Sequence, residues 1–136
     1  MKIVPCGSVP TTSAPSSHFT GRVLHQALVL REAPARLAAA LVSFEPRART
    51  YWHTHPFGQT LYVVSGAGQA QSWGGPVREI RAGDVVVFEP GEKHWHGGGP
   101  ATAMSHVAMQ EHVDGVSATW LEEVADEAFD ASPAGG

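Results

Sequence analysis

Five of the eight histidines of this chain lie between His53 and His106, in three short segments. The first segment, WHTHPFGQT (52–60), contains two histidines that are two residues apart. Alternate residues of a β-strand face the same side, so His53 and His55 would present two imidazoles to a single ion. Gln59 has the same parity if the chain stays extended after the Pro-Phe-Gly turn, and its amide oxygen can also ligate a cation. Because paired histidines also occur on solvated loops, this segment alone leaves both interpretations open.

Two later segments, GEKHWHGG (91–98) and TAMSHVAMQE (102–111), add more groups of the same kind. Each places polar side chains at alternate positions, so each would present them to one face of a strand. An antiparallel barrel brings such distant strands together around a shared interior. Buried polar groups are costly unless they ligate or hydrogen-bond a partner, so their number favours a functional site. The candidates are His53, His55, Gln59, His94, His96, His106 and Gln110.

The segments that must position these side chains are short apolar or alternating runs, separated by turn-forming clusters rich in Gly and Pro. Many short strands at such regular spacing predict an antiparallel all-β sandwich or barrel. The predicted strands are Arg22–Leu30, Arg36–Phe44, Gln59–Ser65, Gln69–Trp73, Val77–Ile80, Val85–Phe88, His94–His96 and Thr102–Gln110.

The two ends of the chain depart from this pattern. Residues 117–129 place apolar side chains at helical spacing with acids on the other face, which predicts one short helix packed on the barrel. Residues 1–20 are rich in Pro, Ser and Thr, which predicts an irregular N-terminal arm. We therefore expect one domain, with the barrel and its closing helix over residues 21–130 and a flexible tail over residues 131–136.

The composition excludes several classes of protein. A chain of 136 residues suits one domain, and its net charge of -4 offers no basic surface for nucleic acid. Cys6 is the only cysteine, so an intrachain disulfide and a thiolate metal cluster are both excluded. No run approaches the roughly 18 apolar residues of a membrane span, so we expect a cytoplasmic protein that does not bind membranes.

The remaining polar and aromatic residues receive more ordinary interpretations. We expect His18, His25 and His112 on solvated loops, where histidine beside small residues is common. Trp52, Trp73 and Trp95 are expected in the core or at contacts between subunits. Exposed tryptophans together with edge strands predict a homodimer or a homotetramer.

The histidine segments resemble the two sequence motifs of the cupin family. The first cupin motif is an HxH led by a glycine and followed by an acid and then a glycine, and the second has spaced glycines before a histidine. This chain has no leading glycine in the first motif. The matching positions are His53, His55, Gln59 and Gly66 in the first motif and Gly83, Gly91 and His94 in the second. Gln59 stands where the family usually has a glutamate, which removes a negative charge from the ligand set. The resemblance implies a single cupin barrel, which is a double-stranded β-helix or jelly roll.

A narrower resemblance covers about residues 36–125. The segments ARTYWHTHPFGQT, GDVVVFEPGEKHWHG and TAMSHVAMQE are similar to the small bacterial cupins described as manganese-dependent hydroxynitrile lyases. This similarity implies a small-molecule substrate and a divalent metal ion, with Mn²⁺ first and Fe, Co, Ni or Zn as alternatives. It assigns the metal to His53, His55, Gln59 and His94, catalysis to His96, His106 and Gln110, and the substrate pocket to Ala40 and Val42.

The activity that this resemblance implies is the cleavage or synthesis of a cyanohydrin. Three neutral imidazoles and a neutral amide would leave a divalent ion its full charge, which favours Lewis-acid chemistry. His96 or His106 would take the hydroxyl proton, and an aldehyde or ketone plus hydrogen cyanide would leave. The sequence leaves two alternatives open: a metal-dependent cupin oxygenase acting on a small organic substrate, and a non-catalytic cupin that binds a metal or a small molecule.

Overall fold

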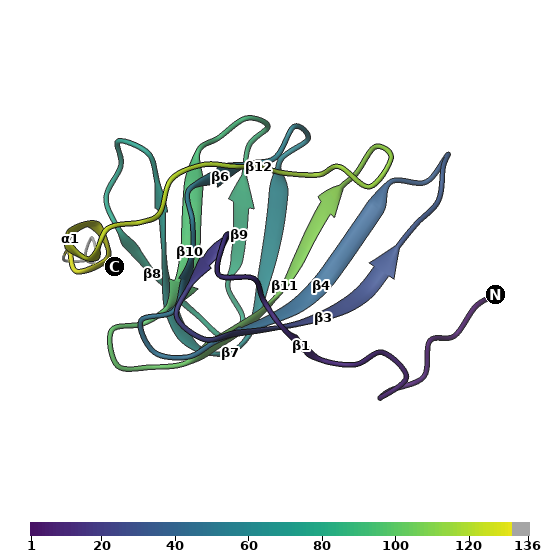
Figure 1. Cartoon of the computed structure of the whole chain (residues 1–136), viewed down its shortest axis with the longest axis horizontal. Coiled ribbons are helices and arrows are strands. Elements are labelled where there is room, and N and C mark those ends of the chain that lie inside the picture. Colours follow the sequence, from purple (N-terminus) through teal and green to yellow (C-terminus); the bar gives the residue numbers. More distant parts are fainter. Residues whose placement is uncertain (132–136) are drawn as a thin grey trace.

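A computed structural model of the chain describes residues 1–131 as a curled, antiparallel β-structure with one short helix near the end of the described part (Figure 1). The strands pair in the order β1-β3-β4-β11-β7-β10-β5-β2, and β6, β8, β9 and β12 attach beside this path. The longest strands are β3 (Val23–Leu30), β4 (Leu37–Phe44), β7 (Gln59–Ser72) and β11 (Met104–Glu111). The shorter strands are β1 (Thr12–Ser13), β2 (Phe19–Thr20), β5 (Arg49–Thr50), β6 (His53–Thr54), β8 (Arg78–Arg81), β9 (Val85–Phe88), β10 (His94–Gly98) and β12 (Thr119–Trp120). The predicted all-β class is confirmed.

Strand β7 joins the two halves of the curled sheet. Its first half pairs with β11 and β9, and its second half pairs with β10 and β8. The change of partners occurs near Gly66, whose φ is 75°, and a Cβ atom there would lie 2.0 Å from the carbonyl oxygen of Ala103. Only glycine fits this bend without displacing the neighbouring backbone. Because β7 crosses between the halves, Gln59 at its start and β10 beside its end border the same interior.

The interior between the two halves is apolar except where the histidines lie. Inward side chains alternate along β4, β7 and β11, as the two-residue period of a strand requires. Leu61, Val63 and Met104 are among the fully buried examples. A second apolar cluster includes Trp95, which alternates with the inward histidines of β10 and so lies on the outer face. Its members are Trp52, Val77, Trp95, Val124 and Phe129.

The C-terminal segment differs from the helix predicted over residues 117–129. The helix α1 covers only Asp126–Phe129, and Thr119–Trp120 forms strand β12, which pairs with β6. Pairing with β6 satisfies the extended backbone of this segment, so its apolar side chains pack against separate surfaces instead of one helical face. The prediction of one short C-terminal helix is confirmed, but the predicted length is wrong.

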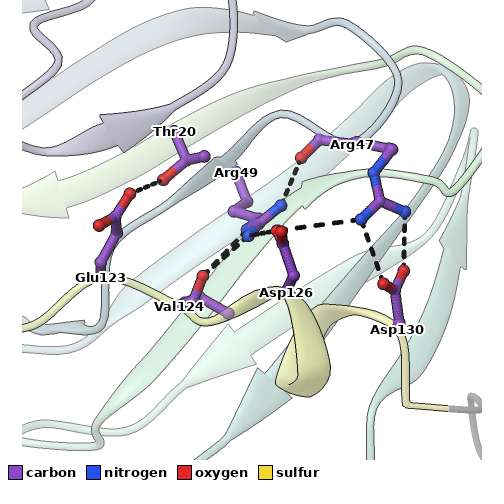
Figure 2. Close-up of polar contacts among 7 residues, drawn as sticks. All are labelled: Thr20, Arg47, Arg49, Glu123, Val124, Asp126 and Asp130. Carbon is purple, nitrogen blue, oxygen red and sulfur yellow. Dashed lines mark hydrogen bonds and ion pairs between the residues drawn. The ribbon is translucent and has the colours of Figure 1, made fainter.

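A buried arginine fixes the last part of this segment to the barrel (Figure 2). The Arg49 guanidinium donates to the Val124 carbonyl at 2.8 Å and to Asp126 at 2.7 Å. Its guanidinium carbon also lies 4.7 Å from the centre of the Phe129 ring. Because breaking a buried charge network leaves groups unpaired, these contacts hold the segment firmly against the sheet of β10.

Two histidine predictions are wrong. His25 lies on strand β3, and His112 is buried with its Nε2 donating to the Arg31 carbonyl, so neither occupies a solvated loop. The predicted N-terminal arm contains the short strands β1 and β2. Residues 132–136 of the predicted tail lie outside the described residues. Within residues 1–131, no helix is long and apolar enough to cross a membrane.

Candidate metal centre

The five clustered histidines converge inside the barrel. His53 of β6 is the register partner of His94 of β10, and His106 lies on the nearby strand β11. All five residues are buried, with exposed fractions of 4% or less. The ring centroids of His53 and His94 are 4.3 Å apart, and those of His53 and His55 are 5.0 Å apart. The fold therefore brings together the three segments that carry the candidate residues.

Backbone carbonyls hold three of these rings by one nitrogen each. In every case Nδ1 donates to the carbonyl oxygen, which can only accept a hydrogen bond. The pairs are His53 with Tyr51 at 2.8 Å, His94 with Glu92 at 2.7 Å and His55 with Ser117 at 2.6 Å. The proton of each neutral ring therefore lies on Nδ1, and the lone pair lies on Nε2. Metal-binding histidines are typically oriented in this way, so these three rings are prepared to act as ligands.

Gln59 adds an oxygen donor to this group. Its Nε2 donates to Oε1 of Gln110 at 3.0 Å, which leaves its own Oε1 directed toward His94. That oxygen lies 3.1 Å from Nε2 of His94. Because the proton of His94 is on Nδ1, two lone pairs face each other in a buried space, and this is unfavourable without a cation. The contact fits a metal ion held by both residues.

The other two histidines bind each other instead of the backbone. Nε2 of His106 lies 2.9 Å from Nδ1 of His96, so one ring donates a hydrogen bond to the other. The two outer nitrogens of the pair, Nε2 of His96 and Nδ1 of His106, are buried and have no hydrogen-bond partner among residues 1–131. Phe44 packs against both rings, with centroids 5.9 and 5.4 Å away. Both outer nitrogens are therefore free to exchange a proton with a molecule in the site.

Burial keeps all five rings neutral at neutral pH. Desolvation is the largest cause in each case, and it lowers the pKa of His94 and of His106 to about 4. The pKa values of His53 and His96 are lowered well below the ordinary value by desolvation and by neighbouring histidines. Desolvation also lowers the pKa of His55. Neutral imidazole is the form that binds a metal ion or accepts a proton, so the site is ready for both.

The structure and the sequence resemblance select different, overlapping sets of three histidines. The ligand nitrogens of His53, His94 and His96 all lie within 4.8 Å of one another, which defines a compact three-histidine group. The resemblance of the sequence assigns His55, not His96, to the metal. His55 has the backbone anchor expected of a ligand, whereas Nδ1 of His96 contacts another ring. The compact group supplies three imidazoles to one point, and its donors fit a divalent metal ion.

Aromatic side chains to which the sequence assigns no role enclose the histidines. Phe88 stacks on His94 with centroids 3.7 Å apart, and Trp120 lies 4.6 Å from His53. The apolar spacing around Trp120 predicts a helix, so the sequence does not indicate that Trp120 lies on a strand opposite His53. The carbonyls that orient the rings have no sequence signature, because every residue carries one.

The predicted pocket residues lie on β4, the strand next to His106. Ala40 and Val42 are buried on β4, and Val42 is the register partner of His106. A cavity of about 280 Å³ opens where Gln59 and Gln110 reach the end of the barrel. A larger hollow of about 640 Å³ lies beside β8 and β9. Among the described residues, no histidine lines either cavity, but Gln59 and Gln110 line the smaller one, so it is the one that borders the candidate site.

The chain is similar in sequence to known proteins. The family model described as Cupin domain matches residues 40–107. The chain is also 53% identical over 129 residues to (R)-mandelonitrile lyase from Granulicella tundricola, a match that covers 95% of this chain and 98% of that protein.

Solved structures agree with the fold. A cupin-like protein from Thermotoga maritima is 39% identical, with a TM-score of 0.82 over 87% of this chain and 90% of that one. The polyketide cyclase RemF from Streptomyces resistomycificus has a TM-score of 0.73 over 96% of this chain and 91% of its own, at 16% identity. The second likeness concerns the fold alone.

Proposed function

Because this chain belongs to the cupin family, we propose on that premise that it is a metal-dependent lyase that cleaves and forms cyanohydrins. The observation that carries the proposal is a buried, hydrogen-bonded histidine pair next to three rings whose Nε2 atoms are directed away from their backbone anchors. Such a site combines a place for a cation with a place for a mobile proton. The 53% identity to (R)-mandelonitrile lyase supports the substrate class.

The metal ligands in this proposal are His53, His55, Gln59 and His94, and Mn²⁺ is the expected ion. A bound divalent ion would supply positive charge that stabilises the developing charge on the substrate oxygen. All four donors are neutral, so none of them offsets that charge. The absence of a carboxylate from this set also distinguishes it from the two-histidine, one-carboxylate sites of non-haem iron oxygenases.

The proton chemistry belongs to His96 and His106. The pair accepts the hydroxyl proton of the cyanohydrin at the unpartnered nitrogen that faces the substrate. The O–H electron pair becomes the second bond of a carbonyl, the C–C bond to the nitrile breaks, and its electrons leave with cyanide. Return of the proton to cyanide gives hydrogen cyanide and an aldehyde or ketone. General acid–base catalysis of this kind contributes about 10²–10⁴-fold to a rate.

Gln110, Ala40 and Val42 orient the substrate in this scheme. Oε1 of Gln110 accepts a hydrogen bond from Gln59, so the Gln110 amide N–H groups are directed to other acceptors, such as the nitrile nitrogen. Val42 lies opposite His106 and Ala40 lies opposite Ala108, so both would face the substituent on the carbonyl carbon of a substrate held near His106. A small organic cyanohydrin fits a space of this kind better than a large one.

Metal content and mandelonitrile cleavage test the proposal together. The purified protein is expected to contain about one divalent ion per chain and to release hydrogen cyanide from mandelonitrile. Chelation should abolish cleavage, and added Mn²⁺ should restore it. The same preparation is placed in an oxygen electrode, because substrate-dependent oxygen uptake would indicate the oxygenase alternative. Cleavage that persists after metal removal and in His106→Ala would contradict the proposal.

A further inference from the structure

Three aromatic rings form a continuous stack from the surface to the candidate metal centre. The outermost ring is that of His18, which is stacked on Trp120 with centroids 4.4 Å apart and planes 7° apart. The Trp120 ring in turn lies 4.6 Å from His53, at an angle of 31°. The rings of Trp120 and His94 pack against the His53 ring, and His53 is only 1% exposed, so almost no solvent contacts it. The orientation of His53 is therefore determined largely by what packs on it.

The segment of His18 also contacts the backbone group that orients His53. Nδ1 of His53 donates to the carbonyl of Tyr51. The amide of Tyr51 donates to the His18 carbonyl at 2.8 Å, and its hydroxyl donates to the Ser16 carbonyl at 2.8 Å. Tyr51 is thus held at both ends of the residue by the N-terminal arm. A shift of the arm would move the carbonyl that sets the tautomer of His53.

The two ends of the chain are joined to each other over this site. Strand β2 of the arm pairs with β5, and β12 pairs with β6, so the two segments lie on either side of Tyr51. The Thr20 hydroxyl donates to the carboxylate of Glu123 at 2.9 Å, which links the segments directly (Figure 2). Phe19 adds an aromatic contact with Trp120, with centroids 5.6 Å apart. The N-terminal arm and the segment that contains β12 therefore hold the stack from two sides.

We propose that Trp120, supported by His18, is a positioning residue that holds the imidazole of His53 in the orientation required to bind a divalent metal ion. Neither residue is a ligand in this inference, which rests on the metal site of the proposed function. Trp120 acts on the ring face of His53, and the arm acts on the Tyr51 carbonyl. Outer contacts that orient a ligand are typically worth about 10–100-fold in metal affinity.

The test measures metal affinity in the full-length protein, with the dissociation constants of Mn²⁺ and Co²⁺ determined by competition with a chelator. Trp120→Ala should weaken binding about tenfold, and Trp120→Phe, which keeps an aromatic face on His53, should stay within about threefold of the wild type. His18→Ala should weaken binding about threefold. The visible spectrum of the Co²⁺-loaded protein should change in Trp120→Ala, because the spectrum reports the orientation of the ligands.

Trp73→Ala is the matched control. Trp73 is 62% exposed and packs edge-on against Trp52, with centroids 4.9 Å apart, so this variant also removes a tryptophan contact from the surface. It should alter the thermal unfolding temperature without changing either dissociation constant. If Trp120→Ala does not fold, His18→Ala decides the question.

Two outcomes would overturn the inference in distinguishable ways. If the wild type binds the ion while Trp120→Ala, or failing that His18→Ala, binds it equally tightly with an unchanged spectrum, the stack does not position His53. If the wild type binds neither Mn²⁺ nor Co²⁺, the proposed function fails first and this inference fails with it.

Discussion

The five clustered histidines form two groups that differ in what holds their rings. His53, His55 and His94 are each held at Nδ1 by a backbone carbonyl, whereas His96 and His106 hydrogen-bond to each other. A carbonyl fixes the tautomer, because it cannot donate a proton in return. A second imidazole does not fix it, because either ring can be the donor. The first group is therefore suited to hold a cation, and the second is suited to move a proton.

Removing a ring from the anchored group should have the largest effect. His94→Ala deletes a lone pair at the point where the other donors meet, and it also leaves the Gln59 oxygen without its neighbour. We expect metal affinity to fall by more than about 100-fold, beyond the range for residues that only orient a ligand, and cyanohydrin cleavage to fall with it. Chelator competition and hydrogen cyanide release measure the two effects.

His112→Ala is the control for this change. His112 is also buried, but its ring contacts the Arg31 carbonyl and the Gly115 amide instead of the site. The His112→Ala variant should be less stable than the wild type and should keep its metal affinity. Normal metal binding by His94→Ala would show that the anchored group is not the ligand set.

Removing a ring from the second group should lower the rate of cleavage and leave metal binding largely unchanged. His106→Ala takes away one half of the proton pair, so kcat should fall by about 10²–10⁴-fold. The metal dissociation constant should stay within a few-fold of the wild type, since His106 is not one of the three rings that a backbone carbonyl holds at Nδ1. Stopped-flow cleavage assays on metal-saturated protein, together with chelator competition, separate the two quantities. Loss of the metal from this variant would place His106 in the same group as His94.

The sequence predicts the first group better than the second. HxH on a strand implies two inward rings from the period alone, and the motif resemblance adds His94 and Gln59, so these donors could be named without coordinates. Nothing in the sequence states that His96 and His106 touch, because their contact depends on how far β10 and β11 curl toward each other. The place of Trp120 was hidden for a related reason. Its apolar neighbours fit a helix, but pairing with β6 overrides that local pattern.

The pH dependence of the free energy of unfolding should show what the two groups share, which is the burial of their rings. Desolvation lowers the pKa of all five rings, so between pH 6.5 and about 4 the unfolded chain binds more protons than the folded chain. The free energy of unfolding of the metal-free protein should therefore fall as the pH falls through this window, by up to about 1.4 kcal/mol per pH unit for each histidine. Below about pH 4, His94 and His106 take up protons in the folded state too, and their contribution to the slope ends.

Urea unfolding in the presence of a chelator, at pH values from 6.5 down to 4.5, measures this slope. Because desolvation acts on both groups alike, His94→Ala and His106→Ala should each reduce the slope by about one proton, although only the first loses metal. In the presence of Mn²⁺ the two groups should again behave differently, because the ion competes with protons only for the rings of His53, His55 and His94. A slope that does not change in either variant would mean that these rings titrate alike in the folded and unfolded chains, and that burial does not keep them neutral.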